Sequence, residues 1–419
     1  MREMKDSGIE WIKQIPTGWT TTRGKNILQL MKRPPEADDE VITCFRNGEV
    51  TLRRNRREEG FTFSDKEIGY QGIKKGDLVI HGMDGFAGAI GISDSDGKGS
   101  PVLVVCTTKE NARYLVYYLR TLAMQDVFLA LATGIRERSC DLRWNKIADL
   151  LFPVPELDEQ CRIADYLDRK CSQIDAIIAR QQEVIEKLKA YKLSVITEAV
   201  TKGLNPDVPM KDSGVEWIGE MPRHWKIAKI KNYCQLKTGV TPSTSNAEWF
   251  DGEVQWFTPG DFNESYRLSK SKRTLSKKAL ESNVAVIAPA NTVMIIGIGA
   301  TAGKVGLSDV ECSFNQQITA LLTNSVNPKF LMYWMIANTK FLRETALFTT
   351  LPILNNQTIG NYLLLCPANR IEEKRIVDFL DEKCNEIEST ISAKENIIDK
   401  LVDYKKSLIY EVVTEKKEV

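Results

Sequence analysis

The chain has few histidines and no closely spaced cysteine pairs, the features that build the commonest metal sites. It has two histidines, His81 and His224, and nine cysteines, none of which forms a Cys-x-x-Cys pair. This usage argues against a zinc site and predicts reduced thiols that serve as ordinary core residues. A nucleophile elbow, a His-Glu-x-x-His motif and a nuclease carboxylate set are all missing, so we expect a chain that is not catalytic alone and binds no cofactor or metal.

Long apolar runs and an excess of one charge are missing too. No stretch approaches the roughly 20 apolar residues of a membrane span, and the N-terminus has no signal-peptide core. We therefore expect a soluble, cytoplasmic protein with no membrane segment. Lys and Arg number 57 against 56 Asp and Glu. Nucleic-acid binding would thus require local basic clusters.

Two short motifs resemble functional sites but depart from them. The run Gly299–Lys304 has three residues between its glycines, and Val305 follows Lys304, whereas a P-loop needs four residues and then Ser or Thr. Asn327-Pro-Lys-Phe330 is similar to the Asn/Asp-Pro-Pro-aromatic element of adenine methyltransferases, but Lys329 replaces the second Pro. We interpret this second motif as a helix N-terminus with Pro328 in the first turn.

The longest regular pattern is a helix over residues 158–202, which contain neither Gly nor Pro. Apolar residues recur at steps of three and four, as in a coiled-coil seam, and the helix would be roughly 65 Å long. The seam residues are Leu167, Cys171, Ile174, Ile178, Ile185, Leu188 and Val195.

The same pattern returns from Arg375 onward, at an offset of 213 residues. The second seam consists of Leu380, Cys384, Ile387, Ile391, Ile398, Leu401 and Leu408. Polar interruptions repeat as well, because Lys192 aligns with Lys405. A helix with one apolar stripe must bury it, so we predict that the two helices pack together as an antiparallel coiled coil.

A second repeat lies ahead of each helix. Residues 5–19 and 211–225 share a Lys-Asp-Ser-Gly start, a Glu-Trp-Ile centre, a Pro and a closing Trp, at an offset of 206. We interpret these as docking segments, in which Gly8 and Gly214 make a turn and the last tryptophan packs against a helix end.

The residues between each docking segment and the following helix have mixed α and β character. Strand patterns occur at 77–80, 101–105 and 292–296, and amphipathic helices at 112–131 and 328–341. A glycine loop survives in both copies and aligns Gly82 with Gly297. Pro155 and Pro367 end a strand before each long helix. The predicted fold class is α+β, with two mixed α/β domains, two long helices and an internal pseudo-twofold repeat.

Local positive charge lies inside the two mixed domains. Such clusters are typical of phosphate contact, and Arg, Lys, Asn and Gln on loops also suit base-edge readout. The candidates in the first domain are Arg46, Arg53, Arg54, Arg56, Arg57, Lys74, Lys75, Arg136 and Arg138. Those in the second are Arg267, Lys270, Lys272, Arg273, Lys277, Lys278, Thr301 and Lys304, with the run Asn315-Gln-Gln317 as a weaker one.

The chain, in which a mixed domain followed by a long helix occurs twice, resembles the specificity subunit of type I restriction-modification systems over essentially its entire length. The resemblance is carried by the doubled docking segment, by Glu159-Gln160 leading into Arg162-Ile163, and by Phe379-Leu380-Asp381 in the second helix. At the second junction Leu365 and Glu373 stand where Pro153 and Gln160 stand in the first. We therefore expect different packing at that junction.

The resemblance implies four segments: a target-recognition domain at 1–157, a central spacer helix at 158–203, a second target-recognition domain at 204–370 and a C-terminal spacer helix at 371–419. Each domain would read one half of a split, asymmetric site in double-stranded DNA, while the helices set the gap. Partners would be two modification subunits, which methylate adenine, and restriction subunits. S-adenosylmethionine, ATP and Mg would bind on those partners.

Two other hypotheses come from different classes. A coiled-coil protein-protein scaffold without DNA readout would show no salt-dependent affinity for duplex DNA. A standalone nuclease would cleave DNA in a metal-dependent reaction as an isolated chain.

Overall fold

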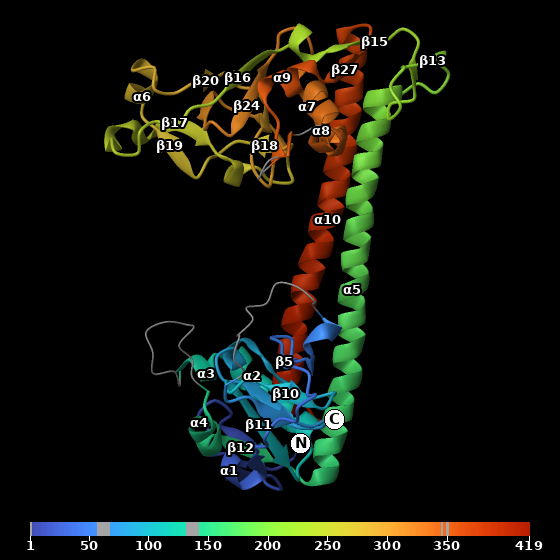
Figure 1. The fold of residues 1–419 in the computed structure, drawn as a ribbon. Coiled ribbons are helices and arrows are strands. Elements are labelled where there is room, and N and C mark those ends of the chain that lie inside the picture. The colour runs from blue at the N-terminus through green and yellow to red at the C-terminus, as the bar shows by residue number, and fades with distance from the viewer. Residues whose placement is uncertain (1, 57–67, 131–141, 345–346, 349–351) are drawn as a thin grey trace. The chain divides into compact units, whose positions relative to one another are not determined.

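The structure, a computed structural model, describes residues 2–56, 68–130, 142–344, 347–348 and 352–419. The chain forms two compact units, one of residues 1–181 with 395–419 (unit 1) and one of residues 182–394 (unit 2). Each unit consists of a mixed α/β head packed on a section of two long helices (Figure 1). The fold class predicted from the sequence is confirmed.

The long helices are α5 (Leu157–Lys202) and α10 (Arg370–Val413). In unit 1, Arg2 forms ion pairs with both Glu159 and Glu415, whereas further along α5 Asp175 pairs with Lys405. Residue numbers therefore rise on one helix and fall on the other, as predicted for an antiparallel pair. In unit 2 the two helices are joined in the same way by an ion pair between Lys192 and Glu388.

The predicted seam residues lie along this pairing. Those whose side chains are buried are Leu167, Cys171, Ile174, Ile185, Leu380, Cys384, Ile387 and Leu408. Those half-buried are Ile178, Leu188, Val195, Ile391, Ile398 and Leu401. Lys192, which interrupts the apolar pattern, is itself buried.

The head of unit 1 is built on an antiparallel sheet in the order β4-β11-β8-β9. Its strands are β4 (Leu28–Leu30), β11 (Leu103–Thr108), β8 (Leu78–His81) and β9 (Ile90–Ile92). Smaller antiparallel pairs are β1 (Met4–Asp6) with β2 (Gln14–Pro16), β3 (Thr20–Arg23) with β12 (Leu151–Val154), β5 (Ile42–Cys44) with β6 (Val50–Leu52), and β7 (Gln71–Ile73) with β10 (Gly97–Gly99). The helices are α1 (Gly24–Ile27), α2 (Ala112–Met124), α3 (Val127–Ala130) and α4 (Trp144–Asp149).

The head of unit 2 repeats this sheet and enlarges it. The main sheet runs β16 (Gln235–Thr238), β24 (Ile318–Leu322), β21 (Val293–Ile296), β22 (Val305–Ser308), β18 (Arg267–Leu268). A second sheet runs β19 (Arg273–Leu275), β17 (Phe250–Phe257), β23 (Cys312–Phe314), β20 (Ile287–Ala288). Strand pairs are β13 (Met210–Asp212) with β14 (Glu220–Pro222), β15 (Lys226–Lys229) with β27 (Leu363–Cys366), and β25 (Leu347–Phe348) with β26 (Pro352–Ile353). The helices are α6 (Lys277–Glu281), α7 (Pro328–Ala337), α8 (Thr339–Glu344) and α9 (Asn356–Asn361).

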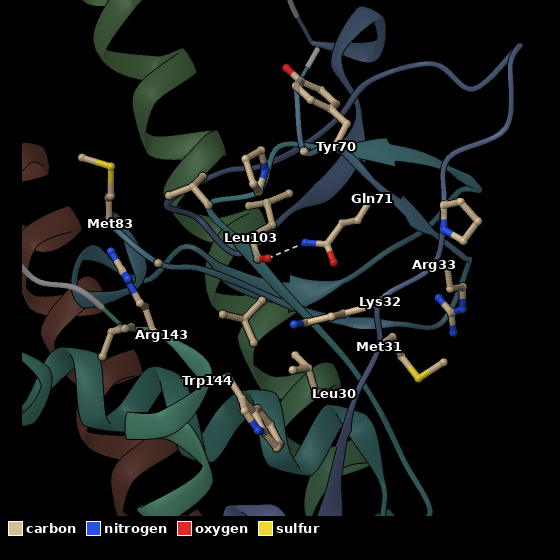
Figure 2. A pocket seen from close by; sticks show the side chains of 17 residues that line it. Leu30, Met31, Lys32, Arg33, Tyr70, Gln71, Met83, Leu103, Arg143 and Trp144 are labelled. Carbon is tan, nitrogen blue, oxygen red and sulfur yellow. Dashed lines mark hydrogen bonds between the residues drawn. The ribbon is translucent and has the colours of Figure 1, made fainter.

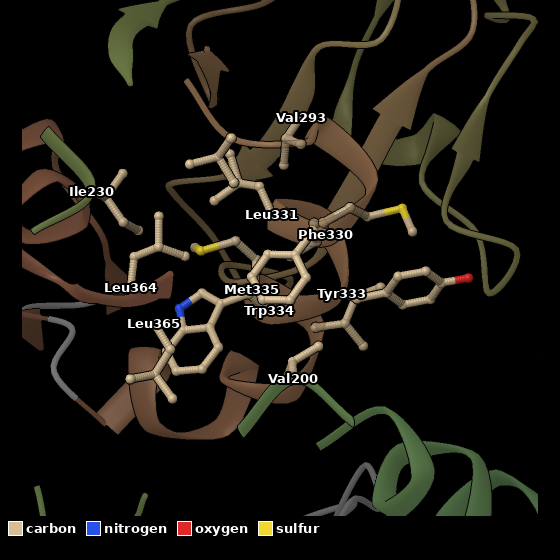
Figure 3. Close-up of a cluster of buried hydrophobic side chains, with 14 of the residues drawn as sticks. Val200, Ile230, Val293, Phe330, Leu331, Tyr333, Trp334, Met335, Leu364 and Leu365 are labelled. Atoms are coloured by element: carbon tan, nitrogen blue, oxygen red, sulfur yellow. The ribbon is translucent and has the colours of Figure 1, made fainter. Parts of the chain in front are cut away.

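The core of unit 2 lies between its main sheet and the long helices. Figure 3 shows Phe330 and Trp334 of α7 between Val293 of the sheet and Val200 of α5. Seven of the ten residues of α7 are buried because the helix is covered on both sides. Burial of large side chains of this kind contributes about 1.5–3 kcal/mol each, so this packing holds the head on its helices.

The doubled docking segments contact the beginning of each long helix, as predicted. The indole Nε1 of Trp19 donates to Glu159 at 3.2 Å, and that of Trp225 donates to Glu372 at 2.9 Å. Both indole rings are buried. Each segment turns at a glycine in the left-handed region, where φ is 67° at Gly8 and 72° at Gly214, a conformation that other residues adopt at a cost.

A second repeated contact joins each head to its helix. In unit 1, Asp168 of α5 accepts from the Arg113 guanidinium at 2.6 Å and from the Tyr117 hydroxyl at 2.7 Å. In unit 2, Asp381 of α10 accepts from the Lys329 ammonium and from the Tyr333 hydroxyl. Each carboxylate therefore fixes the first turns of the helix that packs on it.

The two junctions are more alike than their sequences predict. Gln160 Oε1 accepts from the backbone N–H of Asn111 at 2.9 Å, and Glu373 Oε2 accepts from that of Asn327 at 2.8 Å. The expectation of different packing at the second junction is therefore wrong for this contact. Amide and carboxylate oxygens are both acceptors, so the exchange preserves the bond.

Two predicted helices are interrupted. The one expected over 112–131 breaks at Asp126, which has a φ of 56°, so that α2 and α3 are separate. The one expected over 328–341 breaks at Asn338, whose side-chain amide donates to the Trp334 carbonyl at 2.7 Å. Both residues are short and polar and offer the backbone such alternatives. The interpretation of Asn327 is confirmed, because its side chain caps α7.

Candidate nucleic-acid interface

The first basic run is largely neutralised by neighbouring carboxylates. Its ion pairs are Arg46 with Asp84 at 2.8 Å, Arg54 with Glu40 at 2.8 Å, Arg56 with Glu49 at 3.2 Å, and Lys74 with Glu36 at 3.0 Å. Glu36 raises the pKa of Lys74 through a hydrogen bond. Arg53 is half-buried, and Lys75 is exposed without an ion pair in the described part of the chain. Arg57, Arg136 and Arg138 lie outside the described residues.

The second basic run is divided between paired and unpaired cations. Its ion pairs are Arg267 with Asp309, Lys277 with Glu253, Lys278 with Glu248, and Lys304 with Glu264. The Arg273 guanidinium lies 4.6 Å from the centroid of the Phe250 ring and 5.2 Å from that of Trp256. Lys270, Lys272 and Thr301 are exposed. Such pairing removes much of the positive field that the two runs predict, so charge alone does not delimit the interface.

A hollow of about 950 Å³ lies at the end of the main sheet of unit 1. Figure 2 shows Lys32 and Gln71 extending toward its middle, with Met83 and Arg143 at the opposite edge. Gln71 is held by a hydrogen bond from its Nε2 to the Leu103 carbonyl at 2.6 Å. Tyr70 and Trp144 complete a lining that combines aromatic rings with exposed cationic groups.

Unit 2 has a hollow of about 430 Å³ with a different lining. Its polar groups are amides and hydroxyls, from Thr238, Gln316, Gln317, Asn355, Asn356 and Gln357. The side-chain oxygen Oδ1 of Asn356 accepts from the hydroxyls of Thr319 at 2.9 Å and Thr238 at 3.2 Å. No charged side chain lines this hollow, among the residues described.

Sequence reasoning missed most of these residues. Gln316 and Gln317 were weaker candidates, but Lys32, Arg143 and the run 355–357 were not singled out. None of them belongs to a charge cluster in the sequence, because the fold assembles them from separate segments. The available signal was the repeated glycine loop, since Gly82 and Gly297 line these two hollows.

His81 stands beside the first hollow, and its Nδ1 is held by backbone hydrogen bonds. Its Nδ1 accepts from the backbone N–H of Asp84 at 3.0 Å and from that of Met83 at 3.3 Å. Burial lowers the pKa of His81, and the nearby Asp84 only partly offsets this. Within the described ranges, no three His, Cys, Asp or Glu side chains gather closely enough to hold a metal ion.

Comparison with known proteins identifies the second half of the chain directly. The family described as Type I restriction modification DNA specificity domain matches residues 222–396. The chain is 21% identical to the EcoR124I/EcoR124II specificity subunit of Escherichia coli over 96% of its own length and 94% of the relative. These findings support the resemblance to type I restriction-modification specificity subunits.

Other type I specificity subunits match over shorter stretches. The MjaIX specificity subunit of Methanocaldococcus jannaschii is 26% identical over 39% of this chain and 40% of the relative. The HindI specificity subunit of Haemophilus influenzae is 25% identical over 37% of its own length. The chain thus aligns with about two fifths of these two relatives.

Solved structures support the fold of the specificity subunit over the full chain. A structure from work on complex assembly and conformational transition of the type I R-M system has a TM-score of 0.73, at 15% identity, covering 95% of this chain and 98% of that one. The HsdS subunit from Thermoanaerobacter tengcongensis has a TM-score of 0.50 at 15% identity, with coverage of 96% and 97%. In the described part of the chain, no helix is both long and apolar enough to span a bilayer.

Proposed function

We propose that this chain is the DNA-recognition subunit of a type I restriction-modification complex, in which each head reads one half of a bipartite, asymmetric duplex site. The observation that carries the proposal is the repetition of one plan. Each unit has the same docking segment and the same carboxylate contact between head and long helix, made by Asp168 in unit 1 and Asp381 in unit 2. Each also has a hollow at the same end of its main sheet, but the two hollows differ in chemistry. Equal scaffolds with unequal linings suit two different half-sites.

The paired helices would set the gap between the half-sites. Their antiparallel pairing is fastened by an ion pair in each unit, and α5 with its 46 residues would be about 69 Å long. Joining two recognition modules through a stiff spacer makes the second binding step intramolecular. Affinity is then gained only when the separation of the two DNA segments suits the spacer.

Exposed side chains on α5 and α10 support the proposal that two modification subunits dock on these helices. Tyr191 and Tyr404 occupy equivalent places in the repeat, and their side chains are 58% and 52% exposed. Leu193 and Val402, each two residues away in sequence, are exposed as well. Exposed apolar side chains on otherwise charged helices are typical of protein interfaces.

The same proposal covers the chemistry that this chain would leave to its partners. The modification subunits would bind S-adenosylmethionine and methylate adenine, and restriction subunits would use ATP and Mg. The recognition subunit would be non-catalytic and would work in the cytoplasm, where these partners meet DNA.

A methylation map tests the proposal. DNA from cells that carry this chain with its modification partner should show methylated adenines in one bipartite sequence. Removing one heptad from α5 together with the facing heptad of α10 should change the gap and keep the bases. A map with altered bases and an unaltered gap would refute the role of the helices.

Binding measurements separate this function from a scaffold. The complex should bind its duplex with an affinity that falls steeply as salt rises, because released counterions drive phosphate contact. An affinity for duplex DNA that is absent, or independent of salt and sequence, would favour the scaffold without DNA readout. Metal-dependent cleavage by the isolated chain would favour a nuclease.

A further inference from the structure

The two hollows occupy the same place in the repeat. The backbone N–H of Gly82 donates to the Val102 carbonyl at 2.9 Å, and its carbonyl accepts from Leu142 at 2.9 Å. Gly297 makes the same two bonds, donating to Gln317 at 2.7 Å and accepting from Leu354 at 2.7 Å. The backbone framework is thus one structure used twice.

Equivalent backbone positions carry different side chains in the two hollows. Strand pairing aligns Lys32, just after β4, with Thr238 at the end of β16. The residue before α4 is Arg143, and the residue before α9 is Asn355. A position that is cationic in unit 1 is therefore neutral and hydrogen-bonding in unit 2. A difference confined to the lining of a shared framework is what two readers of unlike sequences need.

Several of these groups remain available to a ligand. Lys32 and Gln357 are exposed, and neither side chain has a hydrogen bond in the described part of the structure. The Gln316 oxygen accepts from Thr241, and the Gln317 oxygen accepts from Asn315 at 3.1 Å, so each amide group is held in one orientation. Asn356 is engaged by Thr238 and Thr319 and acts as a positioning residue.

We propose that the two hollows are the specificity-determining sites of the chain. The hollow of unit 1, which contains Lys32, reads guanine, and the hollow of unit 2, which contains Gln316 and Gln357, reads adenine. This inference rests on the proposed function. The major-groove edge of guanine presents two acceptors, N7 and O6, which suit an ammonium or guanidinium group. Adenine presents an acceptor and a donor, which suit the paired oxygen and NH₂ of Gln or Asn.

The test compares single substitutions in the complete complex. Gln357→Ala and Lys32→Ala are each combined with the modification partner, and sequence preference is measured by selection from randomised duplexes at fixed salt. Gln357→Ala should relax one adenine position in one half-site, and Lys32→Ala one guanine position in the other. Loss of one such contact reduces discrimination about tenfold or more. Matched controls are Gln182→Ala and Lys109→Ala, exposed residues outside the hollows, which should leave every position unchanged.

Each other outcome overturns the inference. An equal loss of affinity on all sequences would assign the side chain to a phosphate. An unchanged preference, or relaxation of both substitutions within one half-site, would place base reading elsewhere. If the unsubstituted complex shows no bipartite preference at all, the proposed function fails along with the inference. A bipartite preference that the substitutions leave intact overturns the inference alone.

Discussion

Lys192 of α5 and Glu388 of α10 form an ion pair across the helix seam of unit 2, and the repeat produces the same pair in unit 1 as Lys405 with Asp175 at 2.6 Å. The surroundings differ. The Lys192 side chain is 9% exposed and its ammonium lies 4.7 Å from the centroid of the Tyr266 ring, whereas the Lys405 side chain is 24% exposed. The lysine of one pair is therefore buried in the seam, whereas the lysine of the other lies nearer solvent.

We predict unequal costs for removing the two lysines. Lys192→Ala should lower the free energy of unfolding by about 1–3 kcal/mol, because it leaves Glu388 without its partner and opens the seam. Lys405→Ala should cost less than about 1 kcal/mol, as is usual for exposed pairs. Urea unfolding of both variants measures the difference. Equal costs would show that burial of Lys192 adds nothing to its pair.

The hydrogen bonds that Asp381 accepts should be a main attachment of the unit 2 head to α10. Asp381→Asn replaces a carboxylate that accepts from Lys329 and Tyr333 by an amide with one acceptor, and should lower the free energy of unfolding by about 1–3 kcal/mol. Asp378→Asn is the matched control, because Asp378 forms an ion pair with exposed Lys374 on the same helix. That control should change stability by less than about 0.5 kcal/mol. Similar losses of unfolding free energy in both variants would contradict this role of Asp381.

Protonation of His81 should lower the stability of the folded chain in mild acid. Burial lowers the pKa of His81 below its usual 6.5, so the unfolded chain takes up a proton at a higher pH than the folded chain does. The stabilising contribution of neutral His81 is complete above pH 6.5 and is lost as pH falls through the folded-state pKa. Protonation would also cost Nδ1 its role as acceptor for Met83 and Asp84.

The measurement is urea unfolding between pH 7.5 and 5. His81→Asn offers an oxygen acceptor in place of Nδ1 and does not titrate, so its stability should fall less over this window than that of the natural chain. Parallel pH profiles for the two proteins would rule out His81 as the titrating group.

Gly91 should tolerate no side chain. A Cβ at Gly91 of β9 would lie 1.9 Å from the carbonyl oxygen of Gly48, a backbone atom that cannot move without disturbing the neighbouring turn. Gly91→Ala should therefore cost about 3 kcal/mol. Gly18→Ala, where nothing lies within 4 Å of an added Cβ, is the control and should be nearly neutral. Thermal unfolding of the two variants tests this, and a stable Gly91→Ala protein would contradict it.

Two long helices and two docking segments can be predicted from the sequence alone. Periodicity at steps of three and four, without Gly or Pro, predicts two long helices, because a continuous apolar stripe has to be buried. The repeated docking segments predict their contact with a helix end, and Trp19 and Trp225 make that contact. These are local patterns, or patterns copied within the chain, and so they can be read without the fold.

The grouping of the polar side chains in the two hollows depends on the folded chain. The basic runs are clusters in sequence, but folding brings carboxylates such as Asp84 and Asp309 against them. Lys32 and Arg143 are far apart in sequence, and so are Thr238 and Gln357, yet each pair lines one hollow. Strand pairing across long loops sets these neighbours, and sequence spacing carries no record of them because side-chain contact depends on register rather than on order along the chain.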